Sequence, residues 1–150
     1  MFHVVLVEPE IPPNTGNIGR LCVAAAATLH LVHPLGFQIN DRELKRAGLD
    51  YWPHLRLREW ENWDAFAAAC PTPDRCFLLT TKSSRSYLTQ RFEPGDYLVF
   101  GRETRGLPEK LLAANAERSL TIPMAAEARS LNLATAVGIV LYEARRQHPS

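Results

Sequence analysis

Short apolar runs alternate with longer stretches along this chain. The runs have the length and composition of buried strands, and the stretches between them are long enough for helices. The pattern predicts strands at residues 4–7, 29–32, 54–57, 77–80, 97–100 and 120–122, and helices at 16–27, 41–47, 63–69, 108–114 and from about 130 onward. Such alternation is typical of an α/β fold, a mostly parallel sheet with helices on both faces. Because no repeat or linker interrupts it, we expect residues 1–150 to form a single domain.

The last predicted helix is apolar nearly all round. Leu133 to Leu141 holds few polar positions, so the helix must be buried against its own domain, a second subunit or both. Ser130 and Asn132 lie in its expected first turn, where their side chains can accept hydrogen bonds from backbone N–H groups that lack helical partners. The amino end of this helix is therefore a donor-rich spot in a packed setting, which favours a bound ligand.

The composition fits a globular protein, since 46% of the 150 residues are hydrophobic. No run approaches the roughly 20 apolar residues that span a bilayer, and no signal-peptide pattern is seen, so we expect a cytoplasmic protein without membrane contact. The odd number of cysteines (Cys22, Cys70 and Cys76) and their spacing favour free thiols. The net charge of +1 gives no hint of nucleic acid, but 14 of the 17 basic residues are arginine, which suits phosphate recognition.

Four loops that follow predicted strands carry nearly all the unusual chemistry. They span residues 8–20, 80–86, 101–108 and 123–130. Ligands of open parallel sheets bind outside the carboxyl ends of the strands. The clustering therefore predicts a ligand site at this edge of the sheet.

The first of these loops contains Gly16 and Gly19 at the expected turn from strand to helix. It lacks the third glycine of the dinucleotide fingerprint G-x-G-x-x-G, so a nicotinamide or flavin site is a poor match. Asn14 and Asn17, at the helix entrance, could be caps. Arg20 is expected one turn inside the helix, close enough to the ligand edge to reach a bound phosphate, with a plain surface arginine as the alternative.

The loop after the strand at 97–100 has a glycine at each end. Gly101 would let the backbone approach a ligand or another chain segment closely, and Gly106 would permit a positive φ. An earlier loop places Lys82 and Arg85 among serines. That composition fits a flap that contacts phosphate, although solvated loops look the same.

Other chemistries do not fit the spacing of the residues. The motifs G-x-x-x-x-G-K-[ST] and G-x-S-x-G are absent from the sequence, which argues against a P-loop nucleotidase and a nucleophile elbow. His30 and His33 lie three apart in a strand, so they would face opposite sides and could not share a metal ion. His3, His54 and His148 have no partner at ligand spacing, and we expect no metal.

Three segments together carry a resemblance to a known family. They are PPNTGNIGRLC at 12–22, LVFGRETRGLP at 98–108, and IPM at 122–124 followed by RSLNLA at 129–134. In this order, and spanning nearly the whole chain, they resemble the motifs of the knotted-fold (SPOUT class) RNA 2′-O-ribose methyltransferases. The segments EPEIPPN at 8–14 and RAGLDY at 46–51 narrow the resemblance to the minimal bacterial branch. That branch methylates the 2′-oxygen of the wobble nucleotide of leucine tRNAs.

The resemblance implies a deep trefoil knot in the C-terminal part, a rare exception to unknotted topology. It also implies S-adenosylmethionine as the methyl donor, bound without metal. Backbone groups around five residues would hold it, namely Leu79, Gly101, Ile122, Ser130 and Leu131. Family members act as homodimers, which implies an interface on the terminal helix with Tyr142 nearby. Arg102 and Ala134 stand where close relatives often have proline and serine, and neither is assigned a catalytic role.

The resemblance assigns Arg20 to activating the ribose hydroxyl of the RNA. A guanidinium cannot easily lose a proton, so we expect Arg20 to hold the adjacent phosphate, which relays or accepts the proton. Ribose and cofactor would be positioned by Asn17, Ser130 and Asn132. Further contacts to the tRNA anticodon loop would come from Lys82, Arg85 and Arg129.

The expected target is a wobble cytidine or 5-carboxymethylaminomethyluridine, as the resemblance implies. Glu103 is expected to be structural, bridging loops of the knot. Two other functions stay open. One is a catalytically silent RNA-binding protein of the same fold, and the other is a doubly wound domain that binds a different nucleotide.

Overall fold

The apolar runs form the strands of one parallel sheet in the computed structural model, which describes residues 1–39, 42, 46 and 50–149. The strands are β1 (His3–Val7), β2 (Thr28–Val32), β3 (Arg56–Trp60), β4 (Cys76–Leu79), β5 (Tyr97–Phe100) and β6 (Ser119–Leu120). Their order across the sheet is β3-β2-β1-β5-β4-β6, and each neighbouring pair is parallel. The predicted parallel α/β sheet is confirmed.

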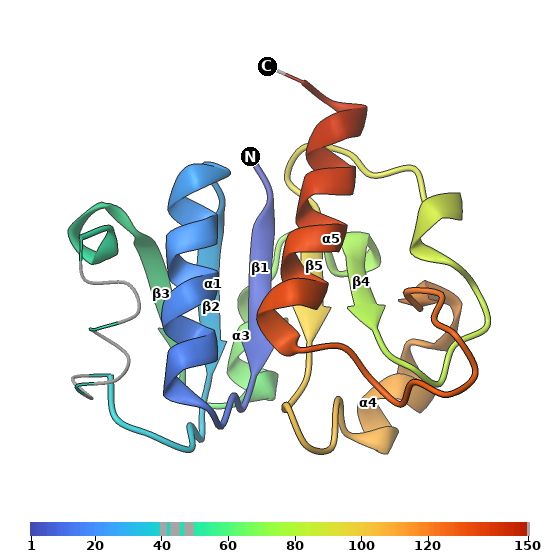
Figure 1. Ribbon diagram of the computed structural model, residues 1–150, viewed down its shortest axis with the longest axis horizontal. Coiled ribbons are helices and arrows are strands. Elements are labelled where there is room, and N and C mark those ends of the chain that lie inside the picture. The colour runs from blue at the N-terminus through green and yellow to red at the C-terminus, as the bar shows by residue number, and fades with distance from the viewer. Residues whose placement is uncertain (40–41, 43–45, 47–49, 150) are drawn as a thin grey trace.

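Helices cover both faces of this sheet. The described α-helices are α1 (Pro12–Ala24), α3 (Trp63–Ala69), α4 (Glu109–Ala114) and α5 (Leu133–Gln147). Single 3₁₀ turns occur at Trp52–His54, Pro73–Arg75, Tyr87–Thr89 and Ala116–Arg118. Figure 1 shows α1 and α5 side by side in front of the sheet and α3 behind it. The predicted two-sided arrangement is therefore confirmed.

Alternate strand residues feed two separate cores. In β1, Leu6 packs with Ile18 of α1 and Val137 of α5 on one face. Val5, its neighbour in sequence, packs with Phe66 of α3 on the other face. Because the interiors of β1, β2, β4 and β5 are buried on both sides, these strands read as nearly continuous apolar runs, whereas the edge strand β3 has no buried residue.

Helix α1 begins earlier than the sequence pattern predicted. Pro12 occupies its first turn, where a missing N–H does no harm and the fixed φ suits a helix. As a consequence, Gly16 and Gly19 lie inside the helix and not at its entrance, which corrects the expected turn. Gly19 packs closely instead, since a Cβ there would lie 3.2 Å from both Leu55 and Trp52 side-chain atoms.

Other element boundaries also shifted. The strand expected at 54–57 runs over Arg56–Trp60, because a 3₁₀ turn containing Pro53 precedes it. The strand expected at 120–122 is only Ser119–Leu120. The helix expected at 41–47 lies outside the described residues. The strand at 97–100 and the helix at 63–69 have the expected bounds.

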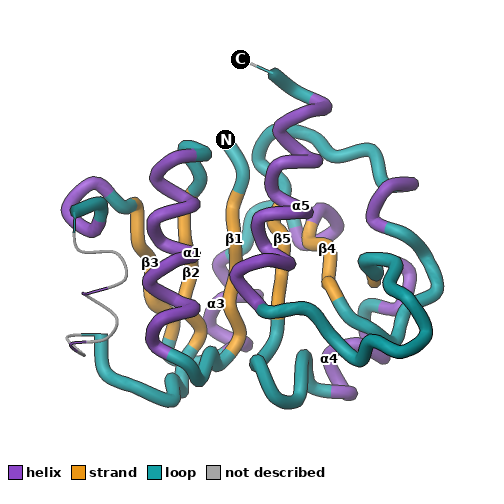
Figure 2. The backbone as a smooth tube through the Cα atoms, in the orientation of Figure 1, coloured by secondary structure: helices purple, strands orange, loops and turns teal. Residues whose placement is uncertain are grey.

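The segment after β6 lies beside the segment after β4. Thr121 N–H donates to the Arg85 carbonyl (2.8 Å), and Tyr87 N–H donates to the Thr121 carbonyl (2.9 Å). From there a long loop leads to α5 along the carboxyl edge of the sheet (Figure 2). This arrangement is compatible with the trefoil knot, which stays a prediction. No helix among the described residues has the length and apolar character needed to cross a membrane.

Candidate active site

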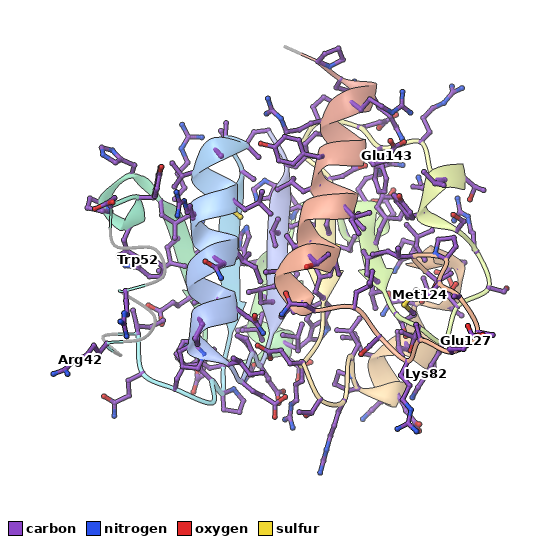
Figure 3. All side chains as sticks on the ribbon, in the orientation of Figure 1. Arg42, Trp52, Lys82, Met124, Glu127 and Glu143 are labelled. Carbon is purple, nitrogen blue, oxygen red and sulfur yellow. The ribbon has the colours of Figure 1, made fainter. Side chains whose placement is uncertain are left out.

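A cavity of about 370 Å³ opens at the carboxyl edge of the sheet. Its walls come from the loops after β4 and β5, the segment after β6, and the residues before and within the first turn of α5. Lys82 and Met124, both of which line it, are labelled at this edge in Figure 3. The volume falls within the range of pockets for small organic ligands.

The five residues expected to hold a cofactor all line this cavity. They are Leu79, Gly101, Ile122, Ser130 and Leu131. These residues are far apart in the sequence. They come together because the carboxyl ends of parallel strands lie at one edge of the sheet and α5 begins at the same edge. The lining mixes apolar side chains with exposed backbone of strand ends, a combination suited to a ligand with both polar and apolar parts.

Gly101 begins a tight hairpin that forms one wall. Arg102 and Gly106 exchange two backbone hydrogen bonds (3.2 and 2.8 Å), and Gly106 has a φ of +68°. A Cβ on Gly101 would overlap the backbone of Gly106 and Leu107. Gly101 is therefore required by the close approach of another chain segment, the returning arm of the hairpin, which is one of the two explanations that the sequence allowed.

Glu103, at the tip of this hairpin, joins it to the start of α1. Its carboxylate accepts hydrogen bonds from the backbone N–H of Glu10 (2.8 Å), the backbone N–H of Ile11 (3.0 Å) and the amide of Asn14 (3.3 Å). The N-cap residue Ile11 has no capping side chain, so Glu103 places its negative charge where the helix dipole favours it.

Asn14 and Asn132 continue the connection to α5. The amide of Asn132 donates to the side-chain oxygen of Asn14 (3.1 Å), and its own oxygen accepts from Thr135 N–H (3.2 Å). Asn132 is thus the N-cap of α5, as its position suggested, whereas Ser130 lies before the helix in the cavity wall. Asn14 is not a cap, because α1 begins before it.

Arg20 and Asn17 lie elsewhere than expected. Both are exposed on α1, three positions apart and hence on neighbouring parts of its surface. Because α1 starts at Pro12, Arg20 lies more than two turns inside the helix, not one, and outside the lining of the cavity. Its guanidinium sits 4.8 Å from the centroid of the Tyr51 ring, a cation–π contact.

The other basic residues that were expected to contact RNA differ in their exposure and in their contacts within the protein. Lys82 and Arg129 line the cavity and are exposed, and Lys82 Nζ lies 3.2 Å from Glu109. Arg85 is engaged within the protein, since it donates to Gln90 Oε1 (2.6 Å) and to the Glu117 carbonyl.

Two further contacts in this region have no sequence signal. Arg102 forms an ion pair with Glu8, whose backbone has a φ of +55°, and this hydrogen-bonded pairing raises the pKa of Arg102. The carboxylate of Glu10 accepts from the hydroxyl (2.7 Å) and the backbone N–H (3.2 Å) of Thr104, which lowers the pKa of Glu10. Both contacts tie the loop after β1 to the hairpin, and they join residues too distant in the chain for any motif to reveal.

Within the described part of the chain, no group of three or more histidine, cysteine, aspartate or glutamate side chains could hold a metal ion. What the site does contain is a cavity between strand ends and the amino end of a helix, bordered by basic side chains. These features define the class: an α/β domain that binds a ligand at the carboxyl edge of a parallel sheet.

Comparison with known proteins identifies the family within this class. Residues 1–142 match the SpoU rRNA Methylase family, and the chain belongs to it. A tRNA (cytidine(34)-2′-O)-methyltransferase of Burkholderia pseudomallei is 52% identical over 98% of this chain and 96% of that protein.

Solved structures agree with the family assignment. One, described as structural insights into the 2-OH methylation of C/U34 on tRNA, has a TM-score of 0.93 at 50% identity and covers 98% of this chain and 95% of that chain. An AdoMet-bound rRNA methyltransferase from Sinorhizobium meliloti has a TM-score of 0.88 at 31% identity, covering 99% of this chain and 57% of that one.

Proposed function

We propose that this protein transfers a methyl group from S-adenosylmethionine to the 2′-oxygen of the wobble nucleotide of a tRNA. The observation that carries the proposal is the cavity at the carboxyl edge of the sheet, in a chain half identical over nearly its full length to tRNA (cytidine(34)-2′-O)-methyltransferases. We further propose leucine tRNAs with cytidine or 5-carboxymethylaminomethyluridine at the wobble position as substrates, and the cytoplasm as the site of action.

The cavity suits S-adenosylmethionine in size and chemistry. Leu79, Ile122 and Leu131 offer apolar surface for a flat base, and the strand ends and Ser130 offer hydrogen-bonding groups for its polar edges. When bound, the cofactor supplies a methyl group on a positively charged sulfur, which needs no metal to make it reactive. An AdoMet-bound family structure at 31% identity supports this choice.

The residues of this chain would hold the RNA and orient its ribose. Arg20 presents an exposed guanidinium that can take a phosphate in bidentate fashion and stabilise charge that develops as the hydroxyl loses its proton. Asn17 lies beside it on α1, and Asn132 fixes the start of α5 through its bond to Asn14. Further RNA contacts would come from Lys82, Arg129 and Arg85.

We propose that the active form is a homodimer built on α5. Tyr142 is 44% exposed on this helix, and partly buried apolar side chains such as Ile139 lie near it. Helix α1 runs alongside α5 and carries Arg20, so a dimer on this face would bring Arg20 toward the junction of two copies. That position accounts for an arginine outside the lining of its own cavity. Sedimentation of an active monomer at assay concentration would contradict it.

Residues 1–150 are proposed to act as one methyltransferase domain. The test is calorimetry followed by transfer. The protein should bind S-adenosylmethionine in the presence of a chelator, with far weaker binding of NAD and ATP, and should move a labelled methyl group to tRNA. Cofactor binding without transfer would leave a silent RNA-binding protein, and preference for NAD or ATP would indicate a different nucleotide-binding domain.

A further inference from the structure

A second cavity, of about 470 Å³, lies at the opposite edge of the sheet. The first residues of four neighbouring strands form its floor, and they are in register with one another: His3, Thr28, Arg56 and Tyr97. The carboxyl end of α3, with Ala69 and Cys70, forms the opposite wall. This site is separated from the first cavity by the length of the strands.

Hydrogen bonds fix the protonation of two histidines in this cavity. Trp60 Nε1, which can only donate, lies 3.0 Å from His30 Nδ1, so that nitrogen accepts. Burial chiefly, helped by His3 and Arg58, lowers the pKa of His30 to about 3, so His30 is neutral and carries its proton on Nε2. That proton is donated to His3 Nδ1, 2.9 Å away.

His3 must therefore carry its own proton on Nε2. Its pKa is lowered by burial and by the positive charges of the N-terminus and Arg58, which keeps it neutral. Among the described residues, His3 Nε2 has no hydrogen-bond acceptor. The chain of contacts from Trp60 through His30 thus leaves His3 as a fixed donor in the cavity lining.

The charges around the cavity are positive. Arg56 and Arg58 line it, no lining residue is acidic, and neither arginine forms an ion pair among the residues described. The nearby carboxylate of Asp96 is already paired with Arg75 (2.7 Å). The carboxyl end of α3 contributes a partial negative charge of about half a unit, which two guanidinium groups and the terminal ammonium outweigh.

The walls are aromatic as well as basic. Trp60, Phe66 and Tyr97 line the cavity, and the guanidinium of Arg58 lies 5.0 Å from the Trp60 ring centroid. Arginines beside aromatic faces suit a ligand that has both a phosphate and a flat base. The volume exceeds what a bare anion needs and falls within the range for a small organic ligand.

We propose that this cavity is a second binding site, for the phosphate of a nucleotide or of an RNA strand whose base packs on the aromatic wall. Arg56, Arg58 and the His3 Nε2 proton hold the phosphate. The site is distinct from the cavity proposed for S-adenosylmethionine, because it occupies the amino edge of the sheet.

The test follows the Trp60 indole N–H signal in the nuclear magnetic resonance spectrum of ¹⁵N-labelled protein. The signal is assigned by its absence in Trp60→Phe. Saturation with S-adenosylhomocysteine first blocks the cavity at the other edge. The probes are then UMP, uridine, and a uridine trinucleotide that ends in a 5′-hydroxyl and so has only internal phosphates.

UMP should shift the signal, and uridine should bind at least tenfold more weakly. A shift with the trinucleotide as strong as that with UMP assigns the site to RNA backbone, and a preference for UMP assigns it to a free nucleotide. Arg56→Gln combined with Arg58→Gln should weaken the binding at least tenfold, whereas the exposed Arg91→Gln should not. The proposal fails if no probe shifts the signal at about 10 mM, if uridine matches UMP, or if the double variant binds normally.

Discussion

Replacing Glu103 with alanine tests whether the hairpin wall is held by its contacts with α1. The carboxylate accepts three hydrogen bonds, at 2.8, 3.0 and 3.3 Å, two of them from backbone N–H groups. Bonds to a charged acceptor contribute about 1.5–3 kcal/mol each when buried. Because Glu103 is only partly buried and the third bond is long, we expect Glu103→Ala to lower the free energy of unfolding by about 2–3 kcal/mol in total.

The loss should be graded and should reach the cavity. Glu103→Gln keeps one acceptor oxygen, so its cost should be about half that of alanine. Because Glu103 anchors the hairpin that begins at Gly101, the affinity for S-adenosylmethionine should also fall several-fold. The assay is urea unfolding at one fixed protein concentration, together with calorimetry.

Glu127→Gln is the matched control, because Glu127 is an exposed glutamate. It should change the free energy of unfolding by less than about 0.5 kcal/mol. If Glu103→Ala costs no more than this control, the Glu103 carboxylate does not hold the hairpin.

Three further predictions concern other positions. Arg20→Ala should leave the affinity for the cofactor almost unchanged but lower the single-turnover rate of methylation by orders of magnitude. Arg20→Lys should restore little of the rate, since one ammonium cannot replace a bidentate contact to phosphate. Arg91→Ala is the control, and near-normal turnover of the folded Arg20→Ala protein would remove Arg20 from the mechanism. Gly101→Ala should weaken cofactor binding and lower the melting temperature, because its Cβ would overlap the hairpin backbone. Gly138→Ala, whose Cβ would lie 3.7 Å from Leu21, should do neither. Normal cofactor binding by Gly101→Ala would contradict this role of Gly101. Burial lowers the folded-state pKa of His30 from 6.5 to about 3, so the unfolded chain takes up a proton first as the pH falls. The free energy of unfolding should therefore drop by about 2 kcal/mol between pH 7 and pH 5. Urea unfolding of His30→Gln over the same pH range should show a smaller drop.

The edge of the sheet that holds the candidate site was predictable because parallel strands bring their carboxyl ends together. Leu79, Gly101 and Ile122 follow three apolar runs, and topology alone places such residues near one another. The start of α1 was not predictable from the glycines, because Gly16 and Gly19 resemble a turn motif. Both glycines lie inside α1, and at Gly19 the helix packs closely on Trp52 and Leu55.

Contacts between distant residues were beyond the sequence pattern. Glu103 meets Asn14 across 89 positions, and Asn132 meets Asn14 across 118. The pairing of His3 with His30 likewise depends on strand register, which fixes two neighbouring strands side by side. The resemblance led us to expect a bridging role for Glu103, but local propensity and motif spacing carry no information about which residues it contacts, so the partners emerge only from the fold.

Methylation of the ribose of the wobble nucleotide of a tRNA is the activity that we propose for this chain. The direct measurement is mass spectrometry of a leucine tRNA incubated with the protein and S-adenosylmethionine that carries a deuterated methyl group, then digested to short fragments and to nucleosides. We expect one deuterated methyl group on the 2′-oxygen of the wobble nucleotide. A methyl group on a base or on another nucleotide, or no transfer at all, would contradict the proposed activity.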